Sequence, residues 1–152
     1  MRVSAKADYA VRAMIELAAG DELSPIKGEV IAERQMIPLR FLENILAELR
    51  HAGLVHSRRG ADGGYWLQRA ADDTTLAEII RAVDGPLATV RGEPPHELVF
   101  PGSAEPLQQV WIALRANIRE ILESVTLADV VADELPEPVR SIADHPEVWS
   151  DR

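Results

Sequence analysis

Apolar residues in the first third of the chain recur at the three- and four-residue spacing of amphipathic helices. Ser4 can cap a first helix, which the apolar repeat carries as far as Gly20. A second, short helix is expected from about Ile26 to Gln35, with Val30 and Ile31 turned inward. These two segments predict the start of a small helical domain.

A third amphipathic helix begins at Ile37-Pro38, because proline suits the first turn of a helix, and Gly53 ends it. Its predicted core stripe consists of Leu39, Leu42, Ile45, Leu46 and Leu49. Its opposite side carries Arg40, Glu43, Asn44 and Ala47. The pattern therefore predicts a helix that presents a polar face to solvent.

After Gly53 the helical period ends and two short strands follow. Residues 54–58 and 65–68 are typical of strands, and the glycine-rich segment 59–64 between them is typical of a tight turn. Three helices followed by a hairpin describe a winged helix-turn-helix. In such a module the last helix enters the major groove of DNA and the wing contacts the backbone or the minor groove.

The second half begins with a capping box, Thr75 to Glu78, which predicts a fourth helix to about Val83 before Gly85-Pro86. The longest helix starts between Ser103 and Pro106 and ends near Val125. Its apolar residues alternate in steps of four and three, the heptad pattern of paired helices. This heptad seam comprises Leu107, Trp111, Leu114, Ile118, Ile121 and Val125.

The expected fold is mainly α, with a winged helix-turn-helix domain and a long dimerisation helix. Thr126 to Asp129 caps a short helix after the long one, and the tail beyond it is acidic, with a structure that the sequence determines only loosely. The predicted division is a DNA-binding domain (1–85), an irregular sensor-like loop (86–102), the dimerisation helix with the short helix (103–134) and the acidic tail (135–152).

The distribution of charge favours a nucleic-acid partner for the first half only. The net charge is −9, but residues 1–70 hold 10 Lys and Arg against 9 Asp and Glu, whereas residues 71–152 hold 6 against 16. A phosphate backbone is repelled by the second half and can approach the first.

Composition excludes several other classes of protein. The chain has no cysteine, which excludes disulfides, thiolate metal sites and a cysteine nucleophile. No apolar run approaches the roughly 20 residues that span a bilayer, and the N-terminus lacks the apolar stretch of a signal peptide, so a cytoplasmic location is expected. No phosphate-loop or metalloprotease motif is present, and an enzyme is not expected.

Both parts of the predicted winged helix carry residues suited to DNA. Arginine can pair with guanine, asparagine with adenine, and glutamate can accept from cytosine. An arginine at the wing tip can enter a narrow minor groove, while a hydroxyl and backbone amides of the turn can bind phosphate. The candidate DNA-binding residues are Arg40, Glu43, Asn44, Ser57, Arg58, Arg59, Gly60 and Gly63.

Several stretches of the sequence resemble the Rrf-two family of transcriptional regulators, the group of IscR, NsrR and CymR. The matching stretches are residues 4–12, 37–46, 49–55, 59–67 and 79–85, with a looser match over the long helix. The resemblance implies a homodimer held by the long helix, a two-fold symmetric DNA site and, for most members, repression. It also implies that Glu43, with Arg40 and Asn44 beside it, contacts bases and that Arg59 enters the minor groove.

One departure from the family concerns its iron–sulfur cluster. Many members hold a cluster with three cysteines between the fourth and the long helix, where this chain has none, so we expect no cluster and no cofactor. Asp8 matches a carboxylate ligand of some members and is expected instead to compensate the helix dipole or pair with a basic group. The set Glu93, His96, Glu97 and Glu105, with Asp8 nearby, is a weak one for zinc or iron, and solvated loop side chains are the simpler interpretation.

Two further groups of residues have alternative interpretations. Trp66 and Trp111 are candidates to line a small-molecule pocket, although packing is the simpler role for Trp111 on the heptad seam. His51 and His56 flank the start of the wing and are candidates for phosphate contacts or plain surface residues.

The sequence thus predicts a sequence-specific transcriptional regulator, a homodimeric repressor that binds double-stranded DNA at a palindromic site. The alternative is a regulator controlled by a partner protein or a small molecule at residues 86–102, which acts mainly as an interaction module.

Overall fold

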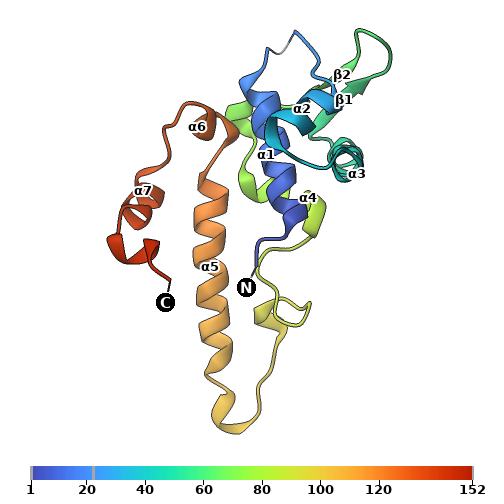
Figure 1. Ribbon diagram of the computed structural model, residues 1–152. Helices are drawn as coiled ribbons and strands as arrows, with labels where there is room; N and C mark the ends of the chain where they lie inside the picture. The colour runs from blue at the N-terminus through green and yellow to red at the C-terminus, as the bar shows by residue number, and fades with distance from the viewer. Residues whose placement is uncertain (1, 22, 152) are drawn as a thin grey trace.

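The computed structural model describes residues 2–21 and 23–151 and is mainly helical (Figure 1). The helices are α1 (Ala5–Ala19), α2 (Gly28–Gln35), α3 (Leu39–His51), α4 (Leu76–Asp84), α5 (Leu107–Ser124), α6 (Leu127–Val131) and α7 (Glu137–Ala143). The strands are β1 (Val55–Arg58) and β2 (Gly64–Leu67), and short 3₁₀ turns include Pro95–Glu97 and Gly102–Ala104. The helices α1 to α3 and the β1–β2 hairpin lie together as a winged helix at one end of the molecule.

The hairpin is antiparallel, with Val55 opposite Leu67 and Arg58 opposite Gly64. Ile26 adds a third partner, because its N–H donates to the Tyr65 carbonyl at 2.9 Å and its carbonyl accepts from the Tyr65 N–H at 2.8 Å. Ile26 was expected at the start of the second helix. That prediction is wrong by two residues, since the backbone groups of Ile26 are committed to β2 and the helix begins at Gly28.

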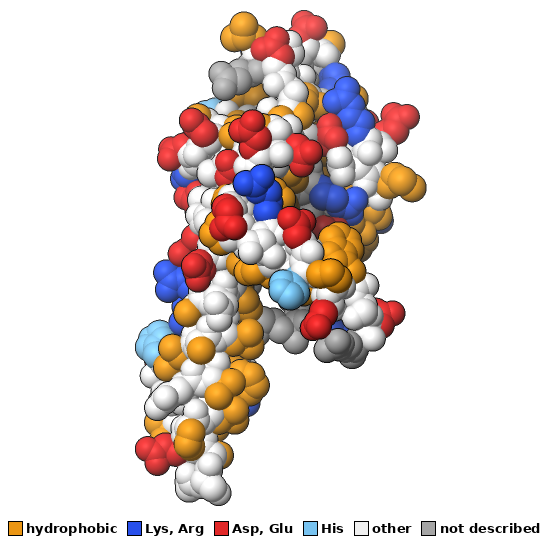
Figure 2. Space-filling model, turned by 90° about the vertical axis from the view of Figure 1, so that its left-hand side faces the viewer, with side chains coloured by type: hydrophobic (Ala, Val, Ile, Leu, Met, Phe, Trp, Pro, Cys, Tyr) orange, Lys and Arg blue, Asp and Glu red, His pale blue; other side chains and the backbone are white. Residues whose placement is uncertain are grey.

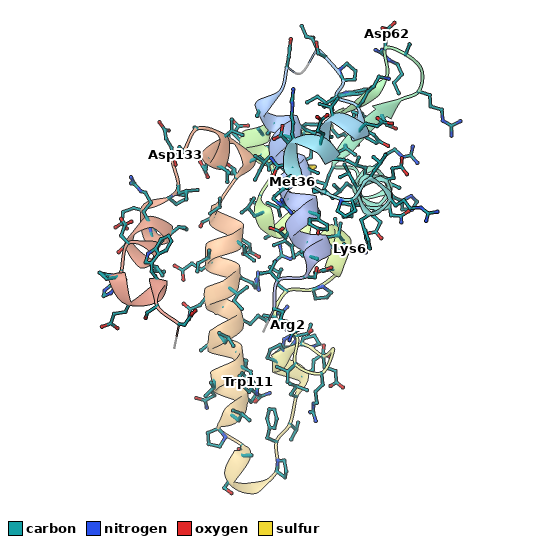
Figure 3. The ribbon with its side chains drawn as sticks, in the orientation of Figure 1. Arg2, Lys6, Met36, Asp62, Trp111 and Asp133 are labelled. Carbon is teal, nitrogen blue, oxygen red and sulfur yellow. The ribbon has the colours of Figure 1, made fainter. Side chains whose placement is uncertain are left out.

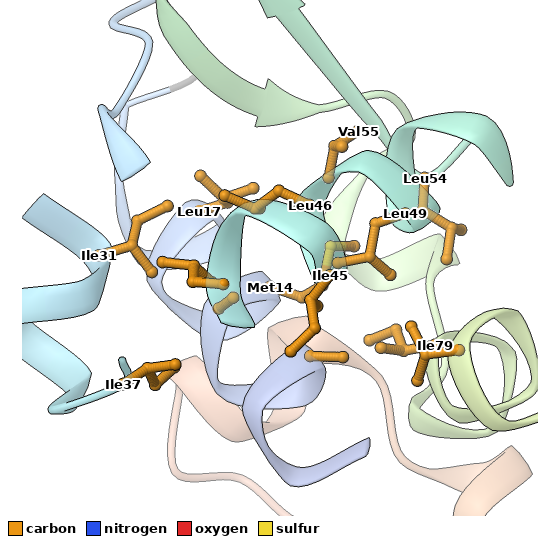
Figure 4. Packing of buried hydrophobic residues seen from close by; sticks show 14 of the residues in the cluster. Met14, Leu17, Ile31, Ile37, Ile45, Leu46, Leu49, Leu54, Val55 and Ile79 are labelled. Atoms are coloured by element: carbon orange, nitrogen blue, oxygen red, sulfur yellow. The ribbon is translucent and has the colours of Figure 1, made fainter. Parts of the chain in front are cut away.

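The hydrophobic core lies among α1, α3, α4 and the wing (Figure 4). Ala7, Ala10 and Ala13 of α1 are 0% exposed, and such small side chains allow neighbouring helices to approach closely. The α3 stripe inserts Leu42, Ile45, Leu46 and Leu49 into this core. Residues at these three- and four-residue steps share one face of a helix, so the opposite face of α3 is left to solvent.

Two expected core residues lie at the surface. Leu39 is 37% exposed because it is the first residue of α3 and lies at its end. Val30 is 36% exposed, whereas the buried face of α2 is formed by Ile31 and Ala32.

The C-terminal end of α5 is joined to the winged helix. The Leu76 N–H donates to the Val125 carbonyl and the Leu127 N–H to the Thr74 carbonyl, each at 3.0 Å. Leu127 is 0% exposed in the shared core, and Val125, which follows the last residue of α5, is 3% exposed. The prediction that Val125 belongs to the heptad seam is therefore wrong, because its own chain buries it.

The rest of α5 extends away from the winged helix as a rod (Figure 1). None of its 18 residues is buried. In the acidic tail, whose structure the sequence determined only loosely, α7 forms after Pro136, and Pro138 lies in its first turn, where proline is favoured. None of the helices in residues 2–21 and 23–151 is both long and apolar enough to cross a membrane.

The helix caps expected from the sequence are present. The Ser4 side chain accepts from the Ala7 N–H at 2.9 Å, and Thr126 forms a capping box with Asp129. In α4, Thr75 and Glu78 form the expected capping box, and Glu78 also pairs with Arg69 at 2.9 Å. Partial burial raises the pKa of Glu78, but the hydrogen bonds from Thr75 and Arg69 and the charge of Arg69 outweigh it, so the net pKa lies below its usual value.

We expect Glu78→Gln to lower the free energy of unfolding by up to about 1 kcal/mol near pH 7, because glutamine keeps the acceptor of the capping box but loses the charge that pairs with Arg69. Because folding lowers the pKa of this carboxyl, its contribution is fully present above about pH 4.3, the ordinary value of a glutamate, and is lost as the pH falls further. Urea unfolding of the two proteins at pH 7 and pH 3 measures the difference. Glu134→Gln is the control, and a difference that persists at pH 3 would contradict the assignment.

Candidate nucleic-acid interface

The outward face of α3 holds together the polar residues expected to read bases. Arg40, Glu43 and Asn44 are exposed and line one shallow hollow of the surface. They project there because the buried stripe on the other side of α3 fixes the rotation of the helix. We call Arg40, Phe41, Glu43 and Asn44 the recognition face.

Phe41 is a member of this face that the sequence analysis missed. It lines the same hollow and is 64% exposed, which is unusual for a large aromatic side chain. The sequence contained a signal for this residue, because an aromatic side chain at position 41 lies outside the apolar stripe of its own helix. Aromatic and methyl groups on a recognition helix can contact the methyl group of thymine.

The two arginines of the wing differ in their freedom. Arg58 donates from Nη2 to the Asp62 carbonyl at 3.2 Å, which folds its side chain over the wing. No hydrogen bond or ion pair within the described chain engages the Arg59 side chain, which is exposed. Asp62 marks the far end of the wing (Figure 3). Arg59 is therefore the more available of the two cations for an external partner.

The wing glycines divide into an accessible one and a structural one. Gly60 is exposed at φ +105°, a conformation that favours glycine. Gly63 is buried, and its N–H already donates to the Gly60 carbonyl at 3.0 Å. The expectation that the Gly63 amide binds phosphate is therefore corrected. Gly63 is required for space, because a Cβ there would lie 2.1 Å from the Arg58 carbonyl oxygen.

Two hydrogen bonds connect the wing to the helices. Lys27, before α2, donates from Nζ to the Gly60 carbonyl at 3.1 Å. Arg50, in the last turn of α3, donates from Nη1 to the Ser57 hydroxyl at 3.3 Å. Sequence reasoning missed both donors, since neither spacing nor composition relates them to the wing. Together they hold the wing beside α3.

The charges of α3 and the wing are not neutralised within the described part of the chain. Five cations on α3, on the wing and just before α2 have no carboxylate partner there: Lys27, Arg40, Arg50, Arg58 and Arg59. In contrast, Lys6, Arg12 and Arg34 form ion pairs with Glu48, Asp8 and Glu16 at 2.8, 3.0 and 3.5 Å. This surface therefore carries an excess of positive charge that an anionic polymer can neutralise.

The aromatic and histidine candidates are distributed over separate parts of the molecule. His56 packs against Trp66 on the hairpin, with ring centroids 5.5 Å apart. His51 is the last residue of α3 and is exposed. Trp111 lies on α5, away from the hairpin (Figure 3), so the two tryptophans do not share a pocket.

The acidic and histidine residues between α4 and α5 are engaged elsewhere or exposed. His96 lies 3.7 Å from Glu97 and, through Nδ1, 3.3 Å from Arg115 Nη1. Glu93 and Glu105 are exposed, and Asp8 pairs with Arg12 as the sequence suggested. Within the part of the chain that the structure covers, no three or more His, Asp or Glu residues are grouped so as to hold a metal ion.

Comparison with known sequences gives a family match over most of the chain. Residues 3–133 match the model of the Rrf2 family, described as iron-dependent transcriptional regulators. An HTH-type transcriptional regulator of Mycobacterium tuberculosis is 46% identical over 144 residues, which cover 95% of this chain and 89% of that protein. The HTH-type transcriptional regulator CymR of Bacillus subtilis is 35% identical, over 87% of this chain and 91% of CymR.

Solved structures agree with the winged-helix architecture. The structure of CymR, the global cysteine regulator of B. subtilis, matches with a TM-score of 0.76 and 34% identity, over 88% of this chain and 98% of that one. The structure of T. potens IscR matches with a TM-score of 0.69 and 35% identity, over 100% and 93% of the two chains.

The iron dependence in the family description does not fit the residues of this chain. A cluster requires thiolates, and the sequence has no cysteine. His96 is the one histidine between α4 and α5, and it faces the guanidinium of Arg115. The positive charge of this guanidinium disfavours a metal cation beside it. The matches in sequence and in fold are nevertheless to transcriptional regulators and not to enzymes. The chain belongs to the Rrf2 family of transcriptional regulators, and it is a member without cysteine.

Proposed function

We propose that this regulator binds double-stranded DNA sequence-specifically, with α3 in the major groove and the wing over the adjacent minor groove. The observation that carries the proposal is the set of five cations on α3, on the wing and just before α2 that have no carboxylate partner among the described residues, in a protein of net charge −9. Phosphates supply the missing counter-charge and align the protein on the duplex. Ser57 can still donate its hydroxyl hydrogen to a phosphate while it accepts from Arg50.

Base recognition is assigned to the recognition face. Arg40 suits guanine, Asn44 suits adenine and Glu43 suits the amino group of cytosine. Phe41 lies beside them and offers an apolar contact to a thymine methyl group. Gly60 is exposed at the wing, where its amide can approach the backbone, and Arg59 reaches the minor groove.

The functional unit is a homodimer joined through α5. Val110 and Leu114 are 55 and 37% exposed on a helix that has no buried residue. Hydrophobic side chains extend along the protruding rod (Figure 2). Such a surface is unfavourable in water, whereas a second α5 would cover it. Of the heptad seam, Leu107, Trp111, Leu114, Ile118 and Ile121 remain as candidates for the interface.

A dimer of this kind would bind a palindromic site and act as a repressor. Two α3 helices related by a two-fold axis read half-sites about one helical turn apart. A bound dimer covers a stretch of the duplex, so it can exclude other proteins from a promoter by steric overlap alone. In vitro transcription from a bound promoter, with and without the protein, tests the direction of the effect.

Selection of binding sites from a random DNA pool, followed by footprinting, tests DNA recognition itself. We expect the purified protein to enrich a two-fold symmetric sequence with half-site centres about 10 base pairs apart. Affinity should fall steeply with salt concentration, as for any interface rich in phosphate contacts. No enriched sequence, or one without symmetry, would contradict the proposal.

Glu43→Ala is expected to relax the base preference with little loss of affinity, because the change removes a contact to a base and also a negative charge close to the phosphates. Loss of one base contact lowers discrimination at that position by about 1–3 kcal/mol. Site selection with the variant protein shows which position becomes degenerate. Glu33→Ala is the control, since Glu33 is exposed but does not line the hollow of the recognition face. An unchanged preference would remove Glu43 from base recognition.

A further inference from the structure

A small basic pocket lies on α5, in the half of the chain that is otherwise strongly acidic. Its cavity of about 190 Å³ is lined by Pro95 and His96 of the 3₁₀ turn and by Ile112, Arg115, Ala116 and Arg119 of α5. The helical residues follow one another in steps of three and one, so they form a single face of the rod. Two of the six arginines in residues 71–152 therefore meet at one small pocket.

The Arg115 guanidinium is incompletely satisfied. Four buried side-chain atoms of the described residues have no hydrogen-bond partner: Arg12 Nε, Glu48 Oε2, Arg69 Nε and Arg115 Nε. The first three side chains each form an ion pair with an oppositely charged residue. Arg115 has only the Nδ1 atom of His96, 3.3 Å from its Nη1. A buried N–H of a charged group is costly without an acceptor, and a bound anion can supply the acceptor that the chain itself does not.

The second arginine adds to this charge. Arg119 donates from Nε to Glu123 Oε1 at 3.0 Å, but the same oxygen also accepts from Arg81 of α4. One carboxylate thus serves two arginines, and among the described residues the exposed Glu97 carboxylate pairs with His96 alone. The pocket keeps an excess of positive charge, and guanidinium groups bind carboxylate and phosphate oxygens well.

Hydrogen bonds hold the two sides of the pocket together, and the pocket stays open when a partner helix covers the heptad seam. The Gln108 side chain donates to the Leu98 carbonyl at 2.5 Å and to the His96 carbonyl at 3.3 Å, which holds the 3₁₀ turn against α5. Ile112, Arg115 and Arg119 each follow a seam residue by one position, a rotation of about 100° around the helix. A partner helix on the seam therefore leaves this face free.

We propose that the pocket formed by His96, Arg115 and Arg119 binds a small organic anion through a carboxylate or phosphate group. Arg115 supplies the unsatisfied N–H, Arg119 the second guanidinium, and Ala116 the space. The ligand would bridge the segment between α4 and α5 to the long helix. Two ion pairs, Arg119–Glu123 and Glu123–Arg81, would also connect it to α4. This binding does not depend on the DNA-binding proposal.

Calorimetric titration of the whole 152-residue chain tests the site. Inorganic phosphate and succinate are the separate probes, and sodium chloride at equal ionic strength is the blank. We expect saturable binding of at least one probe, with one molecule per chain. Arg115→Gln should weaken it about tenfold or more, as loss of a charge-assisted hydrogen bond implies. Arg140→Gln, which removes an equal charge from an exposed position on α7, should leave it unchanged.

Two variants that keep Arg115 exclude loss of folding as the cause of weaker binding. Ala116→Leu fills the cavity without a change of charge and should abolish binding, while circular dichroism shows unchanged helix content. Glu123→Gln frees Arg119 from its carboxylate and should tighten binding severalfold. No saturable binding of either probe, equal binding by Arg115→Gln, or weaker binding by Glu123→Gln would each overturn the site. The phosphate and succinate arms show which oxyanion it prefers.

Discussion

Leu114→Asp is expected to convert the protein to a monomer and to abolish specific DNA binding. Leu114 is 37% exposed in the middle of a helix without a buried residue, so the variant removes no core contact within its own chain. In a dimer the same position faces a second α5, where an unpaired carboxylate is strongly disfavoured. Sedimentation velocity should show half the mass, and the loss of one half-site should reduce affinity for the palindrome by about 10³-fold, to the non-specific level.

The matched control is Gln109→Asp, which adds the same charge to an exposed position of α5 outside the heptad seam. It should sediment and bind like the unchanged protein. Thermal unfolding separates dissociation from unfolding, because monomeric Leu114→Asp keeps the winged-helix core. A Leu114→Asp protein that sediments as a dimer would refute the assignment of the interface to α5.

Arg59→Ala is expected to have the largest effect of any single change at the recognition surface. Arg59 is exposed and has no partner within the described chain, whereas Arg58 is tied to the Asp62 carbonyl. Its guanidinium is free to enter a narrow minor groove, where the negative potential is enhanced. A dimer loses two such contacts, each of about 1–3 kcal/mol, so affinity should fall between about 30-fold and 10⁴-fold.

Fluorescence anisotropy over a range of salt concentrations measures both consequences. The slope of log K against log salt should become shallower by about 2, one counterion for each subunit. Preference for A·T pairs beside the half-sites should also flatten. Arg34→Ala, which removes an equal charge from the ion pair with Glu16, should change little. Comparable losses in the two variants would show a general charge effect instead of a contact by Arg59.

Local pattern was sufficient to predict α1 to α6, both strands and the rotation of α3. In α3 the apolar residues Leu42, Ile45 and Leu46 recur at steps that only one face of a helix provides, so the outward position of Arg40, Glu43 and Asn44 followed directly. Ser4, Thr75 and Thr126 cap helices where their side chains suggested. The absence of cysteine separated this chain from the cluster-binding pattern of its family without any coordinates.

Two of the errors occurred where a distant segment competes for a residue. Ile26 fits the pattern of a helix, but its backbone N–H and carbonyl are hydrogen-bonded to Tyr65, 39 positions away. Val125 continued the heptad pattern, but the strand-like contact with Leu76 buries it in its own chain. The spacing of apolar residues indicates that a residue is buried, but it does not indicate which element buries it.

The chain of amino acids alone was enough to establish a winged helix with an outward polar face, a positively charged first half and an apolar rod, because each of these depends on neighbours a few residues apart. The contacts of Lys27 and Arg50 with the wing, the freedom of Arg59 and the meeting of His96 with Arg115 came only with the folded structure. These depend on side chains from separate elements approaching within a few ångströms. No local pattern encodes such a distance, since it results from how all the elements pack together.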